Sequence, residues 1–358
     1  MASIAPTQYR PEQLSPPGET IRDILDEIGM SQAELARRMG RPANKINQII
    51  QGKRGITADT ALELESVLRL PASFWLNREQ NYQLAKSAQS QLERQKQDCA
   101  VARKFPCAEM ARNGWIEKKS TWLGKYQELL QFFGTAKLDA LNESVQLAPS
   151  FRKADGKKAC PEALAAWLRK GLMDVQGLEL GEFSKQRTID GVESFRELTY
   201  RGVEGLTVEL PAVAAAMGIG VVFVPHLKGT YVGGAAYWHG EIPVIQLSYR
   251  WKRHDILWFN FFHELGHIVL HSRYETYLDD FSEDVSEHER AANRFAAERL
   301  IPRKDWEEFV RVGKFNRHVI QRFSAQVKVA ESIVVGRLHR EERVPPTKLR
   351  EFLIAVPV

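Results

Sequence analysis

The sequence has little that would place the protein outside the cytoplasm. Its 358 residues include three cysteines and no CxxC pair, which argues against a disulfide framework. No run of about 18 apolar residues occurs, so no transmembrane helix is expected. The first residues, MASIAPTQYRPEQLSPPGE, lack the basic and then apolar order of a secretory signal. We therefore expect a cytoplasmic protein with no membrane partner.

Internal repeats and long low-complexity tracts are also lacking, so changes in composition indicate the domains. Short helical patterns separated by glycine are followed by a long polar helical stretch and then by β-rich runs. The predicted fold class is α+β, with a small β-sheet packed on a helix in the C-terminal half. The expected ranges are 1–15 for a flexible tail, 16–85 for an all-α domain, 86–177 for a helical connector, 178–302 for an α+β domain and 303–358 for a helical segment.

Positive charge is concentrated in one short segment. The formal net charge of the whole chain is +5. The segment from Ser31 to Arg54 has the same excess, because Glu34 is its one acid and its basic residues are Arg37, Arg38, Arg41, Lys45, Lys53 and Arg54. Such a segment is either a solvated basic face or a surface that meets a polyanion such as nucleic acid.

The same segment, SQAELARRMGRPANKINQIIQGKRGIT, is typical of a helix-turn-helix. Ser31 and Glu34 form a capping box, Gly40 permits the turn, and Pro42 suits the start of a second helix. We expect Asn44, Lys45, Asn47 and Gln48 to be exposed and to read bases, whereas Arg41, Lys53 and Arg54 are better placed to bind phosphates. The alternative is a helical module that binds protein, with Ile46, Ile49 and Ile50 facing its core in either case.

The stretch WFNFFHELGHIVLHS places polar side chains in an apolar helical run. His263 and His267 are four residues apart, so one helix face presents both imidazoles, with Glu264 beside them. In an HExxH arrangement the histidines bind Zn²⁺ and the glutamate is the general base for the water that attacks a peptide bond. The alternative is a pair of hydrogen-bonded core histidines, but without a compensating ion these buried polar groups would be costly.

Catalytic zinc needs a third protein ligand from another segment. His271 is two helical turns beyond His263, too far along the axis to reach the same ion, so we expect it at the helix end. Glu289 is the better candidate because it shares a predicted helix face with Ala292 and Ala296.

Two alternatives to this assignment stay open. Ser286 and Glu289 form an S-x-x-E capping box, which would explain the glutamate without a metal. The neighbouring Glu283, Glu287 and His288 are other possible ligands. Mn²⁺ is an alternative to Zn²⁺ as the metal.

A β-rich region precedes the HELGH helix. LPAVAAAMGIGVVFVPH predicts a helix that leads into a strand, and GGAAYWHGEIPVIQLSY predicts a hairpin around His239 and Gly240. An edge strand of this sheet could hold an extended peptide by main-chain hydrogen bonds. The following SYRWKRHD offers Tyr249, Arg250 and His254 as donors to a developing oxyanion, without a basis for choosing among them.

HELGHIVLH, followed about twenty residues later by ERAANRFAAERLIP, resembles the ImmA/IrrE family of bacterial zinc metallopeptidases. The resemblance extends from about Thr199 to Pro302 and more loosely to the C-terminus. It implies zinc ligands at His263, His267 and Glu289 and a base at Glu264. Many relatives have EAN where this chain has Ala291-Ala292-Asn293, but the earlier glutamate is retained. Members cleave repressors or immunity proteins, so a protein substrate of that kind is implied.

The segment from PPGETIRDILDEIG to FWLNREQNYQL resembles HigA-type antitoxins of the XRE helix-turn-helix class over about seventy residues. GKRGITADTA and FWLNREQ carry much of this resemblance. Such proteins bind operator DNA as dimers and repress their own operons, and some neutralise a ribonuclease toxin. The implied partners are operator DNA, a second copy of the chain, with half-sites about one helical turn apart, and a toxin.

Together these features predict a bacterial DNA-binding transcriptional regulator with a zinc-dependent endopeptidase domain that cleaves a repressor or antitoxin. A second hypothesis is a HigA-like antitoxin or repressor whose peptidase-like domain is a sensing or toxin-binding scaffold without turnover. A third is self-cleavage between the domains.

Overall fold

The computed structural model of the chain describes residues 15–139, 160–271, 277–278 and 287–357. The chain divides into two compact units, Met1–Cys99 and Ala100–Val358. Among the residues described, none of the helices has both the length and the apolar character needed to cross a membrane.

The first unit is helical throughout its described residues. Its elements are α1 (Pro17–Glu27), α2 (Gln32–Arg38), α3 (Ala43–Ile50), α4 (Ala58–Leu68) and α5 (Ala72–Asp98). Ser31 caps α2 by accepting a hydrogen bond from the Glu34 amide at 3.2 Å, and Gly40 turns the chain toward α3 with φ of 64°. Ile46, Ile49 and Ile50 are buried, as predicted, in a core completed by Trp75. The expected helix-turn-helix is therefore formed by α2 and α3.

Helix α5 does not end where the sequence predicted a domain boundary. The expected boundary after residue 85 falls inside α5, which continues to Asp98. The stretch LAKSAQSQLERQKQD contains no glycine or proline and is made of good helix formers, so nothing in it interrupts the helix. The described part of the predicted connector that follows Cys99 belongs to the second unit.

The second unit contains a small sheet within a larger set of helices. Before the sheet come η1 (Cys99–Lys104), α6 (Cys107–Arg112), α7 (Trp122–Phe133), α9 (Pro161–Val175), α10 (Lys185–Asp190), α11 (Val192–Leu198), η3 (Thr199–Arg201), α12 (Gly202–Glu204), η4 (Gly205–Glu209) and α13 (Leu210–Ala216). The sheet and the remaining elements are β1 (Gly220–Val224), β2 (Gly234–His239), β3 (Ile242–Ser248), α14 (His254–Leu270), β4 (Tyr277–Leu278), α15 (Glu287–Leu300), α16 (Arg303–Val312), α17 (Arg317–Val327), α18 (Glu331–Arg340) and η5 (Arg350–Phe352).

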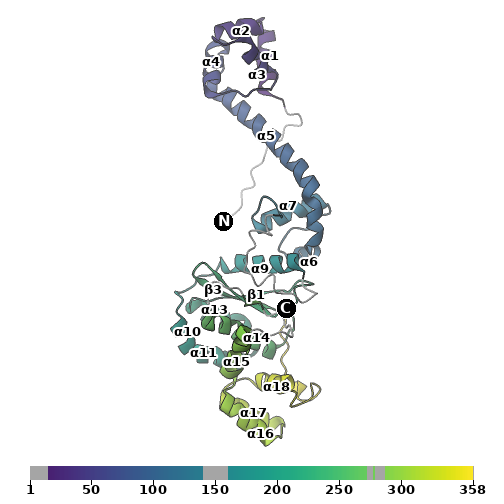
Figure 1. Cartoon of the computed structure of the whole chain (residues 1–358), viewed down its shortest axis with the longest axis vertical. Coiled ribbons are helices and arrows are strands. Elements are labelled where there is room, and N and C mark those ends of the chain that lie inside the picture. Colours follow the sequence, from purple (N-terminus) through teal and green to yellow (C-terminus); the bar gives the residue numbers. More distant parts are fainter. Residues whose placement is uncertain (1–14, 140–159, 272–276, 279–286, 358) are drawn as a thin grey trace. The chain divides into compact units, whose positions relative to one another are not determined.

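The strands form a mixed sheet in the order β1-β3-β2-β4. β1 runs parallel to β3, and β2 and β3 form the predicted antiparallel hairpin, with Gly240 at φ of 62° in its turn. Side chains alternate between the two faces of β3: Gln246 donates to the Trp167 carbonyl of α9, whereas Ile245 and Leu247 join the core that contains α14. The sheet thus lies between α9 on one side and α13 and α14 on the other (Figure 1).

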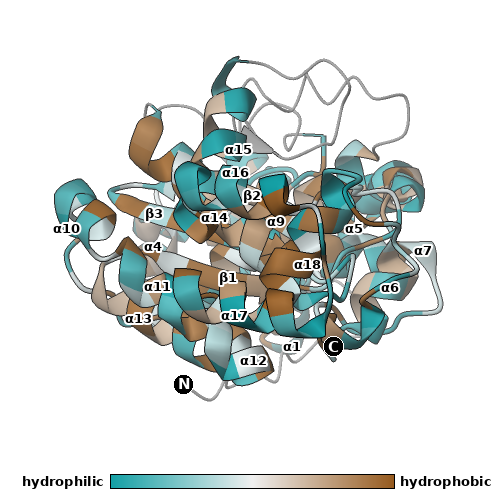
Figure 2. Ribbon diagram, turned by 90° about the horizontal axis from the view of Figure 1, so that it is seen from below, coloured by the Kyte–Doolittle hydropathy of each residue, from teal (hydrophilic) through white to brown (hydrophobic). Residues whose placement is uncertain are grey.

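Helix α14 is the centre of this core. Trp258, Phe261 and Phe262 are fully buried, and almost every residue from His254 to Val269 is buried as well. Figure 2 shows hydrophobic colouring around β1 and a hydrophilic α10 at the periphery. A helix that is enclosed on all sides can be apolar all round, which explains the unbroken hydrophobic run in the sequence.

The predicted separate segment 303–358 belongs to the same core. Trp306 of α16, Phe323 of α17 and Val334 of α18 pack in one cluster with α14 and the sheet. The apolar faces of these helices share that cluster, and α18 lies directly against α14 and α17.

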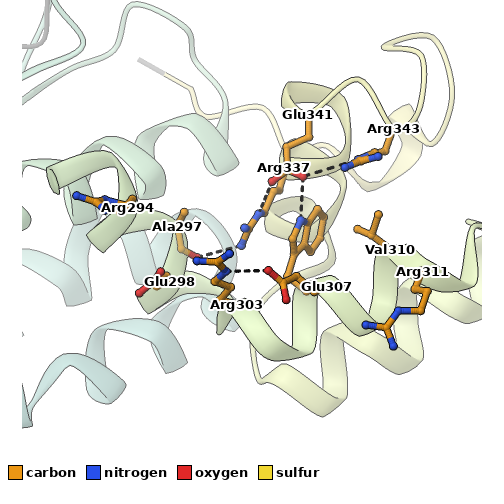
Figure 3. Close-up of a pocket in the computed structure, with 11 residues that line it drawn as sticks. Arg294, Ala297, Glu298, Arg303, Glu307, Val310, Arg311, Arg337, Glu341 and Arg343 are labelled. Carbon is orange, nitrogen blue, oxygen red and sulfur yellow. Dashed lines mark hydrogen bonds and ion pairs between the residues drawn. The ribbon is translucent and has the colours of Figure 1, made fainter. Parts of the chain in front are cut away.

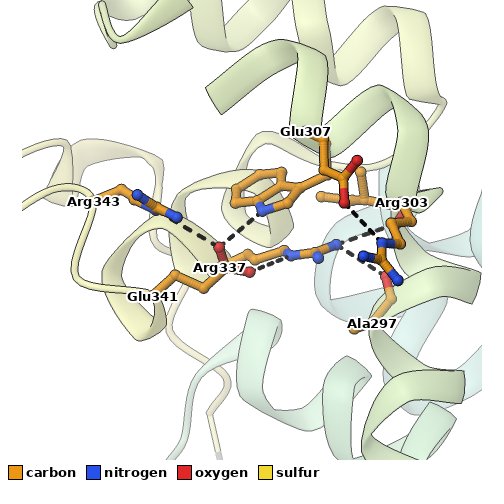
Figure 4. A network of polar contacts seen from close by, with 8 residues as sticks. Ala297, Arg303, Glu307, Arg337, Glu341 and Arg343 are labelled. Carbon is orange, nitrogen blue, oxygen red and sulfur yellow. Dashed lines mark hydrogen bonds and ion pairs between the residues drawn. The ribbon is translucent and has the colours of Figure 1, made fainter. Parts of the chain in front are cut away.

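A polar network joins α18 to α15 and α16. Arg337 donates to the carbonyls of Ala297 and Ile301 at 3.1 and 3.2 Å and to Glu341 at 2.9 Å (Figure 4). Its guanidinium lies 4.4 Å from the centre of the Trp306 ring, and the indole N–H donates to Glu341 at 2.9 Å. Figure 3 shows this network in a pocket whose lining also includes Arg294, Arg303 and Arg311. Arg337 therefore caps the C-terminal end of α15: it adds a second donor to the Ala297 carbonyl, which also accepts from the Ile301 amide, and it supplies a donor to the Ile301 carbonyl.

Replacing Arg337 with alanine should lower the free energy of unfolding by about 2–3 kcal/mol, because two carbonyls lose a charged donor and the indole loses its cation. Urea denaturation followed by circular dichroism measures this. The matched control is Arg343→Ala: Arg343 approaches Glu341 only to 3.9 Å and is 53% exposed, so its loss should change stability by less than about 0.5 kcal/mol. Equal losses in the two variants would contradict the role given to Arg337.

His254 should make the stability of the second unit depend on pH. Burial lowers the pKa of His254 to about 4, and the ring lies 2.8 Å from Ser332 Oγ and accepts from the Trp258 indole at 2.9 Å. In the unfolded chain the pKa returns to about 6.5. The unfolded state then binds the extra proton, so stability is complete above pH 6.5 and falls as the pH drops toward 4, by as much as about 3 kcal/mol.

Urea titrations between pH 4.5 and 7.5 test this. His254→Gln should reduce the pH dependence of the unfolding free energy and leave the part that His267 contributes, whereas the exposed His318→Gln should leave it as in the wild type. An unchanged slope in the His254 variant would show that other groups cause the pH dependence.

Candidate functional site

The two histidines of HELGH meet on one face of α14. His263 and His267 are 1% and 2% exposed, and their Nε2 atoms are 3.0 Å apart. The spacing of four residues brings the rings one turn apart, as the sequence predicted, and both rings present Nε2 to the same point.

Glu289 reaches that point from α15. Its Oε2 lies 3.1 Å from His263 Nε2 and its Oε1 lies 3.2 Å from His267 Nε2. Close packing of the two helices makes this possible: a Cβ on Gly266 would lie 3.2 Å from both Ala292 Cα and the Phe295 ring. Glycine at this position therefore allows α15 to approach α14 closely enough to deliver the carboxylate.

The three groups fit a divalent metal. Their ligand atoms all lie within 4.8 Å of one another. Ligands about 2.0–2.1 Å from a tetrahedral zinc are separated by about 3.3 Å, close to the 3.0–3.2 Å observed here. Two imidazoles and one carboxylate are also a donor set typical of catalytic zinc, which keeps a fourth position open.

The electrostatics of the cluster favour the ligand forms of these side chains. Burial lowers the pKa of His267 to about 4, so its ring is neutral at pH 7. Burial alone would raise the pKa of Glu289, but hydrogen bonds with His263 and His267 lower it to about 2. Neutral imidazole and ionised carboxylate are the forms that bind a metal ion.

Glu264 is fully buried and lies against the first residue of β2. A Cβ on Gly234 would be 2.7 Å from Glu264 Oε1, closer than such atoms approach one another. Only glycine at this position leaves the carboxylate its place beside the strand. The pair Gly233-Gly234 at the start of a predicted strand is the sequence signal that could have indicated this close approach.

Other residues considered from the sequence occupy different positions. His271 ends α14, as expected, and its Nε2 lies 3.2 Å from the carbonyl of His288. Glu287 and His288 are exposed, and neither is in the cluster of ligand atoms. Glu283 and Ser286 lie outside the described residues, so the capping box is not described. The His254 ring is buried in the core, where it is hydrogen-bonded to Ser332 and Trp258. It is therefore not available as an oxyanion donor.

Strand β2 begins at Gly234, beside Glu264, and pairs with β3 along its whole length. β4 pairs with Ala235 and Ala236 of β2. The positions that this register places opposite Tyr237–His239, 274–276, lie outside the described residues. Binding of an extended peptide along an edge of the sheet therefore stays a prediction.

The helix-turn-helix presents most of the predicted DNA-binding residues to solvent. Asn44, Asn47, Gln48, Lys53 and Arg54 are exposed on α3 and the turn that follows. The Asn47 side chain accepts a hydrogen bond from Gln51 at 3.0 Å, which orients its amide.

Two of the predicted contacts differ from the expectation. Lys45 is half-buried, because it lies beside Ile46 and Ile49 at the margin of the core. Arg41 is ion-paired with Glu63 of α4, so its charge is partly neutralised within the unit. Glu63 is more than twenty residues away from Arg41, so no short sequence pattern predicts this pairing.

Two family models match the chain. One, described as helix-turn-helix, matches residues 21–75. The other, described as an IrrE N-terminal-like domain, matches residues 214–339 and includes His263, Glu264, His267 and Glu289.

Relatives match the first unit. Virulence-associated protein I of Dichelobacter nodosus is 39% identical over 74 residues, which are 20% of this chain and 68% of that protein. The uncharacterised HTH-type transcriptional regulator YddM of Escherichia coli K12 is 31% identical over 71 residues, 20% of this chain and 76% of that protein. Among solved structures, Pseudomonas aeruginosa antitoxin HigA with the higBA promoter is 35% identical, covers 22% of this chain and 86% of that chain, and has a TM-score of 0.21.

The fold and the two sites define a class of protein in which one chain carries a helix-turn-helix unit and a small α+β unit with a two-histidine, one-glutamate cluster. The chain belongs to the helix-turn-helix family of transcriptional regulators and carries an IrrE N-terminal-like domain in its second unit.

Replacing Glu289 with alanine should reduce bound zinc from near-stoichiometric to well below half, because two imidazoles alone hold the ion weakly. Mass spectrometry of metals in dialysed protein measures the content. The matched control is Glu287→Ala, an exposed carboxylate in the same first turn of α15, which should keep its metal. Full zinc in the Glu289 variant would exclude this residue as the third ligand.

Proposed function

We propose that this protein is a DNA-binding transcriptional regulator whose second unit is a zinc-dependent endopeptidase that cleaves a repressor or an antitoxin. The observation that carries the proposal is the convergence of His263, His267 and Glu289 within hydrogen-bonding distance inside an otherwise apolar core. The match to the IrrE N-terminal-like domain supports it.

In this proposal His263, His267 and Glu289 hold the metal. Bound zinc supplies Lewis acidity, which polarises a peptide carbonyl and acidifies water. Burial keeps His267 neutral and so available as a ligand, and the two rings keep Glu289 ionised. The core packing of α14 and α15 fixes the three side chains in advance, so little reorganisation is needed when the ion binds.

Glu264 is the proposed general base. Its carboxylate takes the proton from the attacking water and returns it to the amine that leaves. The contact with Gly234 holds this carboxylate next to the start of β2, and we propose that an extended substrate binds along an edge of this sheet. The base and the substrate backbone would then be neighbours.

The first unit would bring this activity to operator DNA. Asn44, Asn47 and Gln48 are exposed on α3 and can reach base edges, and Lys53 and Arg54 follow the helix where phosphates pass. Helix-turn-helix units bind as dimers to half-sites one helical turn apart, and we propose a homodimer for this chain.

Replacing Glu264 with glutamine should abolish cleavage, by about 10²-fold or more, while zinc content and DNA affinity stay as in the wild type. The assay incubates the full chain with candidate repressors or antitoxins from its own genomic neighbourhood and follows the fragments by electrophoresis. Cleavage at the full rate by this variant would rule out the proposed base. A wild-type chain that binds zinc but cuts none of these proteins would favour a scaffold without turnover.

Replacing Lys53 and Arg54 together with alanine should weaken operator binding at all sequences and reduce the slope of log K against log salt by about 2. The matched control removes two exposed charges from α5, Lys86→Ala with Arg94→Ala, and should leave the slope unchanged. Fluorescence anisotropy at several salt concentrations gives both slopes. Equal slopes for the two double variants would contradict a phosphate-binding role for Lys53 and Arg54.

A further inference from the structure

A pocket of about 390 Å³ lies in the second unit where α6, the β1–β2 loop and the segment after β3 meet. Its polar lining includes Glu109, Arg112, His226, Lys228, Tyr231 and Arg250. We call it the loop pocket. Nothing in the proposed zinc chemistry uses these residues.

The loop pocket lies at the same end of the sheet as Glu264. β1 and β3 are parallel and pair through Val224 and Ser248 at their ends, while β2 starts opposite Leu247. The β1–β2 loop and Arg250 therefore lie at this end, and so does Gly234, which contacts Glu264. A peptide bound near Glu264 would have residues within reach of the pocket.

The walls of the pocket are held in place. The Lys228 amide donates to Glu109 at 2.7 Å, and Thr230 Oγ1 donates to the Leu227 carbonyl at 2.8 Å. Arg250 lies between two rings, 5.2 Å from the centre of Tyr231 and 5.0 Å from that of Trp251. Tyr231 adopts φ of 51°, a left-handed conformation that is costly for a residue other than glycine and that places its ring against Arg250.

Among the residues that the structure describes, the basic side chains of the pocket outnumber its acidic ones. Arg112 and the Lys228 side chain form no hydrogen bond or ion pair with any residue that the structure describes. Glu109 is the one carboxylate of the lining, and the Lys228 amide already binds it. Burial and the guanidinium of Arg250 lower the pKa of His226, which is consistent with an excess of positive charge around it.

We propose that the loop pocket binds the carboxylate of an acidic side chain in a peptide and so selects acidic residues close to the bond that is cut. This inference rests on the proposed peptidase function. A guanidinium matches a carboxylate in a two-hydrogen-bond geometry, and Arg112 and Arg250 offer two of them beside Lys228. The volume admits a side chain or a short peptide segment but not a nucleic-acid duplex.

Binding should be measured with the full chain carrying Glu264→Gln, so that the probe is not cut. The probe is a fluorescent peptide of alanine, glycine and serine with a central Glu-Glu pair, and the matched probe has Gln-Gln instead. We expect the Glu-Glu peptide to bind at least about tenfold more tightly, and Arg112→Ala with Lys228→Ala to remove that preference. Both residues are exposed, so the fold should tolerate the change.

Two further double variants distinguish binding in the loop pocket from a general attraction of acidic peptides to positive charge. Lys304→Ala with Arg322→Ala removes the same charge from exposed positions of α16 and α17 and should leave affinity within about twofold of the starting chain. Arg112→Glu with Lys228→Glu should reverse the preference toward a Lys-Lys peptide, which a misfolded chain could not do.

Equal affinity for the Glu-Glu and Gln-Gln peptides, or equal losses in the two alanine double variants, would overturn the assignment. Binding of inorganic phosphate is measured in the same way. If phosphate binds and the Glu-Glu peptide does not, the pocket binds free oxyanions and its assignment to peptides is wrong. Metal-dependent cleavage that ignores acidic residues would refute the pocket alone. Selective binding of the Glu-Glu peptide, together with a wild-type chain that cleaves no substrate, would refute the peptidase function alone.

Discussion

Two imidazoles and a carboxylate, those of His263, His267 and Glu289, lie within 3.2 Å of one another inside a helix layer otherwise filled by aromatic and aliphatic side chains. Polar groups in such a place are costly unless they are bound to one another or to an ion. The surrounding structure is arranged to keep them together: Gly266 lets α15 approach α14, and the sheet and the C-terminal helices enclose both.

The same end of the sheet collects the groups that a peptidase would need. Gly234 opens space for Glu264, and the β1–β2 loop and the segment after β3 bring cationic side chains to the loop pocket. This follows from the sheet order. Because β1 and β3 are parallel and β2 is antiparallel to both, two strand ends and one strand start meet at one place, and loops there are free to vary without disturbing the core.

The C-terminal helices show how one residue can join distant segments. Arg337 binds carbonyls near the end of α15, a glutamate one turn along its own helix, and the ring of Trp306. In the helix-turn-helix unit, Arg41 has a comparable role through Glu63, although its position beside the turn had suggested a phosphate contact. Charge counted along the sequence therefore overstates what a binding surface offers, since pairs across a fold remove part of it.

The sequence by itself determined the local features: the capped helix after Ser31, the turn at Gly40, the hairpin at Gly240, and the histidine pair on one face of α14. These depend on spacings of a few residues, which backbone geometry converts directly into structure. Tertiary structure decided where α5 ends, that residues 303–358 share the core of the α+β domain, that Arg41 is paired, and that Gly234 and the loop pocket lie near Glu264. Those features depend on which distant segments pack together, and packing is set by the shapes of whole faces rather than by any short pattern.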